Sequence, residues 1–121
     1  MSGSYRDLVA WQKAMELVYR IYELTKKFPS DEKYGLVSQL RRAAVSIPSN
    51  IAEGKGRRSD TDMCRFFNTA RGSLHEVETQ ILIAAHLEYI TATENQAISA
   101  QIAEVARILN GLIHTFEAAR A

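Results

Sequence analysis

The sequence predicts an all-α protein, an antiparallel up-down-up-down bundle of four helices. Apolar residues recur at three- and four-residue spacing along four long stretches, which is the pattern of amphipathic helices. The 121 residues include only two prolines and six glycines, and the connections between the stretches are short. An apolar fraction of 46% and a charged fraction of 24% suit an ordinary globular chain. We therefore expect one domain over residues 1–121, with helices at about 7–27, 33–53, 60–88 and 94–118.

The first predicted helix carries two neighbouring apolar stripes. One follows heptad spacing and contains Leu8, Trp11, Met15, Val18 and Tyr22. The other lies beside it and contains Ala10, Ala14, Leu17, Ile21, Leu24 and Phe28. A bundle core needs one such stripe, so the second indicates a further buried surface, such as a subunit interface.

The second predicted helix contains Pro48 within an apolar face. Proline has no amide hydrogen, so the carbonyl of Ala44 loses its helical partner and we expect a kink at Pro48. Polar side chains that could bond the freed backbone groups surround the break: Ser46, Ser49 and Asn50. Gly54 is expected to end this helix as a left-handed cap.

Capping residues mark the start of the third and fourth helices. Ser59 is a predicted N-cap with Asp62 three positions on, and Thr93 with Gln96 is expected to form the capping box of the fourth helix. Gly72 falls inside the third helix, where glycine costs about 1 kcal/mol relative to alanine. We therefore expect another backbone to approach closely there.

The positive charge is concentrated in the middle of the chain. Residues 34–73 carry a net +4, whereas residues 74–121 carry −4 and the whole chain only +1. Cys64 is the single cysteine, so no disulfide forms within the chain. The segment behind Met1 lacks the apolar run of a signal peptide, and the longest apolar run, residues 81–85, is too short to cross a bilayer. These features predict a cytoplasmic protein without a membrane partner.

No residue pattern indicates catalysis. His75, His86 and His114 lack the glutamate three positions earlier that di-metal helical bundles use, so we expect neither a metal site nor a cofactor. Cys64 lies eleven residues before His75, roughly three helical turns away, which is too far for a nucleophile–base pair. The sequence therefore predicts a protein that is not an enzyme.

Four polar residues lie next to or within apolar faces of the second and third helices. They are Arg42, Asn50, Glu53 and Glu78. The favoured interpretation is an interhelical hydrogen-bonded network that fixes the register of the helices. The alternative is a small-molecule or enzyme pocket beside Pro48.

A second set of residues is basic and surrounds the connection between the second and third helices. Together with Arg42, its members are Arg41, Lys55, Arg57, Arg58 and Arg65. Arginine offers bidentate contacts to phosphate, so the set predicts binding of RNA or DNA, above all if it repeats around a symmetric ring. The alternatives are a solvated surface and a structural assembly with a protein partner.

Several motifs resemble a known family over nearly the whole chain, from about Ser4 to Phe116. They are Tyr5-Arg6-Asp7-Leu8, Trp11-Gln12-Lys13-Ala14, Gln39-Leu40-Arg41-Arg42-Ala43-Ala44, Ser46-Ile47-Pro48-Ser49-Asn50-Ile51-Ala52-Glu53-Gly54, Gly72-Ser73-Leu74, Glu78-Thr79-Gln80 and Leu109-Asn110-Gly111-Leu112-Ile113. The chain resembles the bacterial four-helix bundle proteins of the 23S rRNA-intervening sequence family.

This resemblance implies a left-handed bundle that assembles as a homopentamer around a central channel. The chain is distantly similar to the accessory variability determinants of diversity-generating retroelements, which bind a reverse transcriptase and nucleic acid through a basic pentamer surface. The positions that could build such a surface here are Arg41, Arg42, Lys55, Arg57 and Arg58. The acidic residues 74–121 argue against a uniformly basic barrel.

Overall fold

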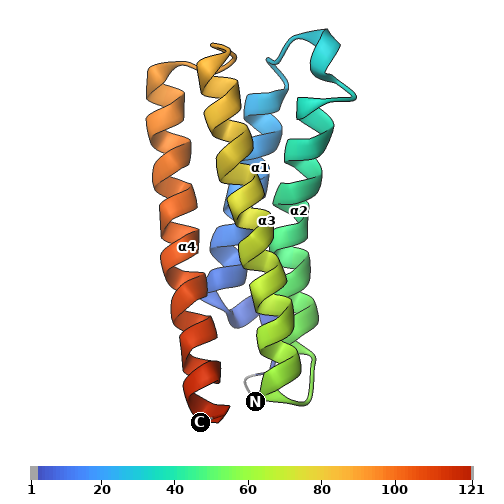
Figure 1. Cartoon of the computed structure of the whole chain (residues 1–121), viewed down its shortest axis with the longest axis vertical. Helices are drawn as coiled ribbons and strands as arrows, with labels where there is room; N and C mark the ends of the chain where they lie inside the picture. Colours follow the sequence, from blue (N-terminus) through green and yellow to red (C-terminus); the bar gives the residue numbers. More distant parts are fainter. Residues whose placement is uncertain (1–2, 121) are drawn as a thin grey trace.

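The computed structural model describes residues 3–120, and the side chains of residues 3–117. It contains the helices α1 (Val9–Thr25), α2 (Leu36–Lys55), α3 (Asp60–His86) and α4 (Ala92–Arg120). Short 3-10 turns lie at Tyr5–Asp7 and Ser30–Glu32, and the described residues include no strand. Successive helices run in opposite directions, so the α2–α3 connection lies at the same end of the molecule as both termini (Figure 1). The predicted antiparallel four-helix bundle is confirmed.

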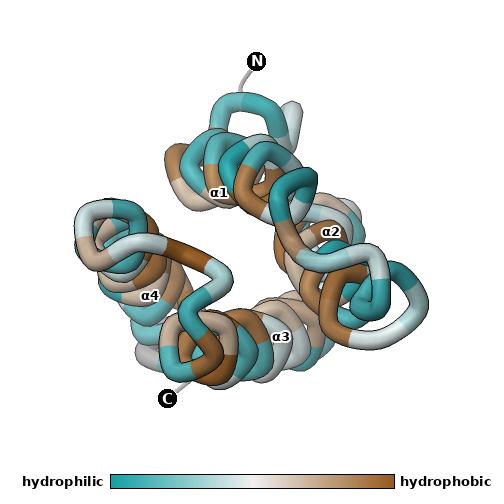
Figure 2. Tube along the Cα trace, turned by 90° about the horizontal axis from the view of Figure 1, so that it is seen from above, coloured by the Kyte–Doolittle hydropathy of each residue, from teal (hydrophilic) through white to brown (hydrophobic). Residues whose placement is uncertain are grey.

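Each helix packs against two neighbours. α1 lies beside α2 and α4, α3 lies beside the same two helices, and the backbones of the diagonal pairs lie farther apart, as the view along the bundle shows (Figure 2). The α2–α3 contact is the most extensive. The largest fully buried side chains come from all four helices: Leu17, Ile21, Leu40, Ile47, Ile51, Phe67, Leu74, Val77, Ile81, Ile98, Leu109 and Ile113. Each such side chain stabilises the fold by roughly 1.5–3 kcal/mol through burial.

The two apolar stripes of α1 have different environments. The stripe that starts at Ala10 and ends at Phe28 is buried throughout and forms the α1 part of the core. Of the heptad-spaced stripe only Val18 is buried, whereas Trp11 is half-buried and Tyr22 is exposed. The second stripe thus lies on the outer surface of the single chain.

α2 is helical without interruption through Pro48. Ser49 Oγ donates to the Val45 carbonyl at 2.8 Å, and Asn50 Nδ2 donates to the Ser46 carbonyl at 2.8 Å. The polar side chains around the proline therefore bond the two carbonyls that follow Ala44, and not the freed Ala44 carbonyl. The kink at Pro48 stays a prediction.

The expected roles of two glycines are wrong. Gly54 lies inside α2, and no glycine among the described residues has positive φ, so it is not a left-handed cap. A Cβ at Gly54 would lie 2.8 Å from Phe67 Cε1 and 2.9 Å from Phe66 Cβ. The glycine is needed because α3 approaches α2 closely there. At Gly72 nothing lies within 4 Å of a Cβ position, so no backbone of the chain approaches it.

One of the two predicted helix caps is confirmed, and the other lies at a different position. Ser59 Oγ accepts a hydrogen bond from the Asp62 amide at 3.1 Å, as the sequence predicts. The capping box of α4 lies two residues earlier than expected. Thr91 Oγ1 accepts from the Glu94 amide at 3.0 Å, and Glu94 Oε1 accepts from the Thr91 amide at 2.9 Å. The prediction of a box at residues 93 and 96 is therefore wrong.

α3 ends in a Schellman motif. The amide of Tyr89 donates to the Ala84 carbonyl at 2.9 Å, and the amide of Glu88 donates to the Ala85 carbonyl at 3.0 Å. Glu88 has φ of 62°, the left-handed conformation that glycine usually provides at this position. Within the part of the chain that the structure describes, no helix is both long enough and apolar enough to cross a membrane.

Candidate functional site

Four basic residues gather at the α2–α3 connection, and we call them the basic end: Lys55, Arg57, Arg58 and Arg65. Lys55 is the last residue of α2, Arg57 and Arg58 lie in the connection, and Arg65 lies in the second turn of α3. The connection is short because Ser59 already caps α3. The fold therefore holds four cations within a few residues of one helix–helix corner.

Two acidic side chains partly neutralise the basic end. Arg57 Nη2 lies 2.7 Å from Glu53 Oε2, and Arg65 Nη2 lies 3.6 Å from Asp62 Oδ1. Among the residues with described side chains, Lys55 and Arg58 form no ion pair. The corner therefore keeps an excess of positive charge.

Two of these arginines contact the aromatic ring of Phe66. The Arg57 guanidinium lies 4.5 Å from the centroid of the Phe66 ring, and the Arg65 guanidinium lies 5.2 Å from it. Cation–π contacts of this kind contribute about 0.5–1 kcal/mol at exposed sites. They also restrict the rotamers of two long side chains, so less conformational entropy is lost when an anion binds.

Arg41 and Arg42 lie away from the basic end. Arg41 precedes Lys55 by fourteen residues, which is about 21 Å along the helix axis. Its Nε donates to Thr25 Oγ1 at 2.9 Å, and its guanidinium lies 4.5 Å from the centroid of the Tyr22 ring. The six basic residues that the sequence groups together thus form two separate surfaces.

The four polar residues predicted to form a network are not joined in the chain. No hydrogen bond or ion pair between described side chains connects any two of Arg42, Asn50, Glu53 and Glu78. Asn50 bonds to Ser46, Glu53 pairs with Arg57, and Arg42 and Glu78 are exposed.

The polar contact that does cross between α2 and α3 is made by two serines. Ser46 Oγ and Ser73 Oγ lie 2.8 Å apart, and Asn50 Nδ2 donates to Ser46 Oγ at 3.0 Å. Ser73 is only 6% exposed. Ser73 is named above only within a family motif and not as a buried polar residue. It shares a helix face with Ala70 and Val77, and a serine in an apolar register is a signal of a buried hydroxyl.

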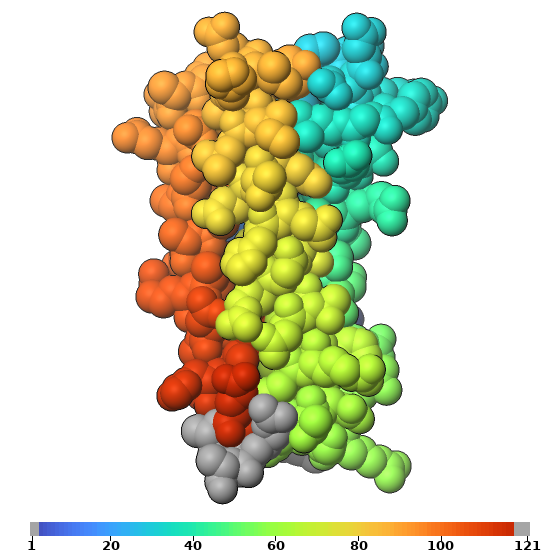
Figure 3. Space-filling view, viewed as in Figure 1, coloured from blue at the N-terminus to red at the C-terminus, as the bar shows by residue number. Residues whose placement is uncertain are grey.

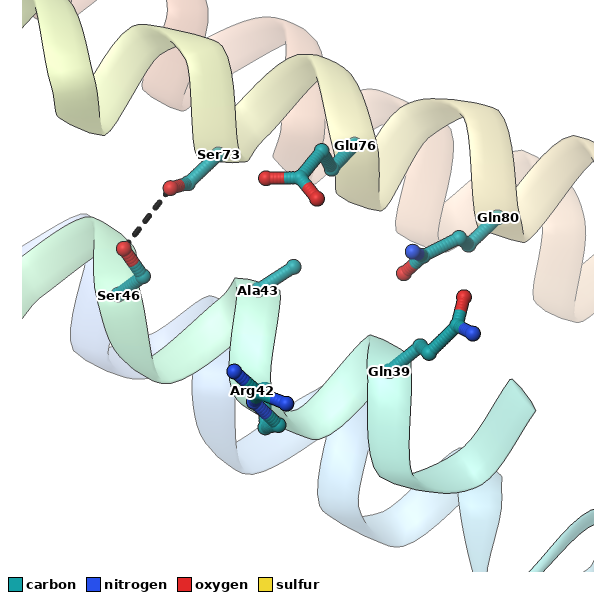
Figure 4. A pocket seen from close by; sticks show the side chains of 7 residues that line it. All are labelled: Gln39, Arg42, Ala43, Ser46, Ser73, Glu76 and Gln80. Carbon is teal, nitrogen blue, oxygen red and sulfur yellow. Dashed lines mark hydrogen bonds between the residues drawn. The ribbon is translucent and has the colours of Figure 1, made fainter. Parts of the chain in front are cut away.

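A polar cavity of about 400 Å³ lies beside this serine pair, between α2 and α3 (Figure 4). The side chains that line it are Gln39, Arg42, Ala43, Ser46, Ser73, Glu76 and Gln80. Arg42 is thus a pocket residue, as one alternative expects, but the facing carboxylate is Glu76 and not Glu78. Arg42 and Glu76 form no ion pair with each other.

Two hollows on the outer α1–α2 face are mainly apolar, and Val45 lines both. One, of about 620 Å³, is lined by Tyr22, Lys33, Tyr34, Val37, Ser38, Arg41, Arg42, Val45 and Ser46. The other, of about 350 Å³, is lined by Tyr5, Trp11, Met15, Val18, Val45, Pro48, Ser49 and Ala52. Four residues of the heptad-spaced stripe of α1 line these hollows: Trp11, Met15, Val18 and Tyr22. Tyr34, which also lines the larger hollow, is 87% exposed.

A second exposed apolar group lies at the C-terminal end of α3 and includes its C-cap residue. It consists of Leu82, Ile83 and Leu87, each at least 45% exposed. α3 and α4 lie side by side on the face of the molecule that Figure 3 shows. The single chain thus exposes apolar side chains at the end of α3 as well as on the α1–α2 face.

The histidines and the cysteine form no recognisable reactive site. His75, His86 and His114 are exposed, and the described residues contain no group of three or more potential metal ligands. Cys64 is 3% exposed, and its sulfur lies 4.0 Å from the Ile113 carbonyl oxygen. It therefore packs between α3 and α4, as a small apolar residue would.

The perturbed titratable groups lie at the opposite end of the bundle from the basic end. Tyr89 donates to Glu32 Oε2 at 2.8 Å, and this hydrogen bond raises the pKa of the Tyr89 hydroxyl. A hydrogen bond from Lys27 lowers the pKa of Glu94, with the Thr91 amide adding to the effect. The first contact joins the α1–α2 connection to the α3–α4 connection, and the second joins it to the first turn of α4, so both stabilise this end of the bundle.

The fold and its surfaces define a helical bundle protein with a basic corner and a polar interhelical cavity. The model of the 23S rRNA-intervening sequence protein family matches residues 6–111, and the chain belongs to this family. The resemblance seen in the sequence is thereby confirmed.

A solved structure supports the same conclusion. It is a crystal structure of a protein of unknown function from the S23 ribosomal protein family of Bacteroides thetaiotaomicron, with a TM-score of 0.81 and 26% sequence identity. The similarity covers 87% of this chain and 98% of that one. A comparison with curated proteins finds no match.

Proposed function

We propose that the chain is a non-enzymatic, homo-oligomeric scaffold that binds RNA or DNA through its basic end, repeated around the assembly. The observation that carries this proposal is the cluster of four cations at one corner, of which Lys55 and Arg58 form no ion pair among the described side chains. Asp60, the first residue of α3, adds a third carboxylate to Glu53 and Asp62, so the corner keeps a net charge of +1. Arg57 and Arg65 are already oriented by Phe66, so a phosphate meets prepared donors.

Oligomerisation is supported by the two apolar surfaces that the bundle leaves open. One follows α1 and α2 around Tyr22 and Val45, and the other includes Leu82 and Ile83 on α3. Different surfaces on one chain suit a head-to-tail contact, which closes into a ring when the rotation between subunits allows it. The number of five subunits and the central channel come from the family resemblance.

Repetition matters because a single chain carries a net charge of only +1. Five copies of the basic end on one rim would produce a ring of positive potential, although residues 74–121 are acidic. Such a ring favours contact with several phosphates of one strand. A protein partner such as a reverse transcriptase could share this rim.

The proposal is tested by a salt titration of binding to fluorescent RNA and DNA oligonucleotides, with the mass of the protein measured in the same buffers. Affinity should fall steeply between about 50 and 200 mM salt because bound cations are released from the nucleic acid. Arg58→Ala should weaken binding and make the salt dependence shallower by about 0.7 per lost contact on a single strand. Arg58 is the better variant because removing Arg57 also frees Glu53.

Arg107→Ala is the matched control, since Arg107 is exposed on α4 outside the basic end. It should leave both affinity and salt dependence near those of the parent chain. Absence of binding at low salt would refute the proposal, and so would an equal loss in the Arg58 and Arg107 variants. A monomeric mass would refute the ring.

A further inference from the structure

We propose that the cavity between α2 and α3 binds a free α-amino acid in its zwitterionic form. Two opposite charges line this cavity without being paired. Arg42 stands on the α2 side and Glu76 on the α3 side, and among described side chains neither takes part in an ion pair (Figure 4). A ligand with one charge of each sign could satisfy both.

An unused acceptor lies beside Glu76. Gln80 Oε1 is shielded from solvent, yet it accepts no hydrogen bond. A shielded carbonyl oxygen without a donor costs about 1–3 kcal/mol. Gln80 projects from α3 toward Gln39 on α2, so the two side chains form one wall of the cavity (Figure 4).

The remaining walls limit the ligand to a small polar molecule. The hydrogen bond between Ser46 and Ser73 lies at one end, and Ala43 contributes only a methyl group. The volume of about 400 Å³ lies in the lower part of the range of small-molecule sites. An amino acid fits this volume, whereas a folded partner does not enter it.

The arrangement of charges favours a zwitterion over a simple anion. The guanidinium of Arg42 can bind a carboxylate through two parallel hydrogen bonds. An ammonium group has three donors and can bind the Glu76 carboxylate on the opposite side. A phosphate in the same space would face the Glu76 carboxylate, and that repulsion selects against it.

Calorimetric titration with each of the twenty L-amino acids, at millimolar concentration and without nucleic acid, tests this inference. At least one amino acid should bind. Arg42→Gln and Glu76→Gln should each weaken it about tenfold or more, since each removes one charged hydrogen-bond partner. Glu78→Gln is the matched control, because Glu78 is exposed on the same helix and outside the cavity.

Propionate and propylamine provide the matching ligand control, since each keeps only one of the two charges. Both should bind at least about tenfold more weakly than the best amino acid. The inference is overturned if no amino acid binds, if propionate binds as tightly, or if the Arg42 and Glu76 variants bind like the parent chain. Arg58→Ala should not affect this titration, so failure here is distinguishable from failure of nucleic-acid binding.

Discussion

Replacing Gly54 with alanine should destabilise the bundle, although alanine is the better helix former. The added Cβ would lie 2.8 Å from Phe67 Cε1, 3.0 Å from Phe67 Cδ1 and 2.9 Å from Phe66 Cβ. The Phe67 ring is fully buried, and the Phe66 Cβ moves only with its backbone, so α2 and α3 must separate. Overpacking of this kind lowers the free energy of unfolding by about 2–3 kcal/mol, and the higher helix propensity of alanine offsets up to about 1 kcal/mol of this loss. The expected net loss is about 1–2 kcal/mol.

Urea denaturation followed by circular dichroism measures this loss, at one fixed protein concentration because an oligomer gains stability with concentration. Gly72→Ala is the matched control. It offers the same gain in helix propensity inside α3, but its Cβ meets nothing within 4 Å, so it should stabilise the chain by about 1 kcal/mol. The reasoning fails if Gly54→Ala is as stable as the parent chain while Gly72→Ala gains stability.

Three further predictions concern the helix termini. Glu88→Gly should raise the free energy of unfolding by about 1 kcal/mol, because Glu88 holds a left-handed φ; an unchanged urea midpoint would contradict this. Ser59→Ala should lower stability by about 1 kcal/mol through loss of the α3 N-cap, and Ser59→Asp should restore it in the same assay. Carbon-detected NMR titration should give Glu94 a pKa below its ordinary value, and Lys27→Gln should raise it. Because the folded-state pKa is lowered, this pair stabilises the fold above the ordinary glutamate pKa, and its contribution is lost as the pH falls through the lowered value.

Much of the fold could be predicted from the apolar pattern. The observed helices begin and end within about three residues of the predicted ones, because burial of the apolar faces decides where helices form. The N-cap role of Ser59 could be predicted because a cap depends only on residues a few positions apart. The predicted position of the α4 capping box was wrong because Thr91 and Thr93 are both followed by a suitable side chain three residues later. In the folded chain the box forms at Thr91 and Glu94.

The function of Gly54 was not predictable from the sequence. A glycine near a helix terminus usually signals a left-handed cap. Its actual role depends on how closely α3 passes, and that distance is set by residues twelve or more positions away, Phe66 and Phe67. At Gly72 the sequence predicts a close approach of another backbone, but nothing lies within 4 Å of a Cβ there, so packing within the chain does not require a glycine. Distances between helices are properties of the packed structure and not of the local pattern.

The candidate sites illustrate the same limit through Arg41 and Arg42. Adjacent residues of an α-helix point about 100° apart, so the two arginines share the hollow of about 620 Å³ but differ in their other neighbours. Arg41 contacts Thr25 and Tyr22 on α1, whereas Arg42 lines the cavity that α3 closes with Glu76. Basic residues in the middle of a helix therefore divide between surfaces, whereas those at or near the helix ends, such as Lys55, Arg57 and Arg58, share one corner. This division explains why the predicted basic surface separates into a phosphate-binding candidate at the loop and a polar cavity higher on the bundle.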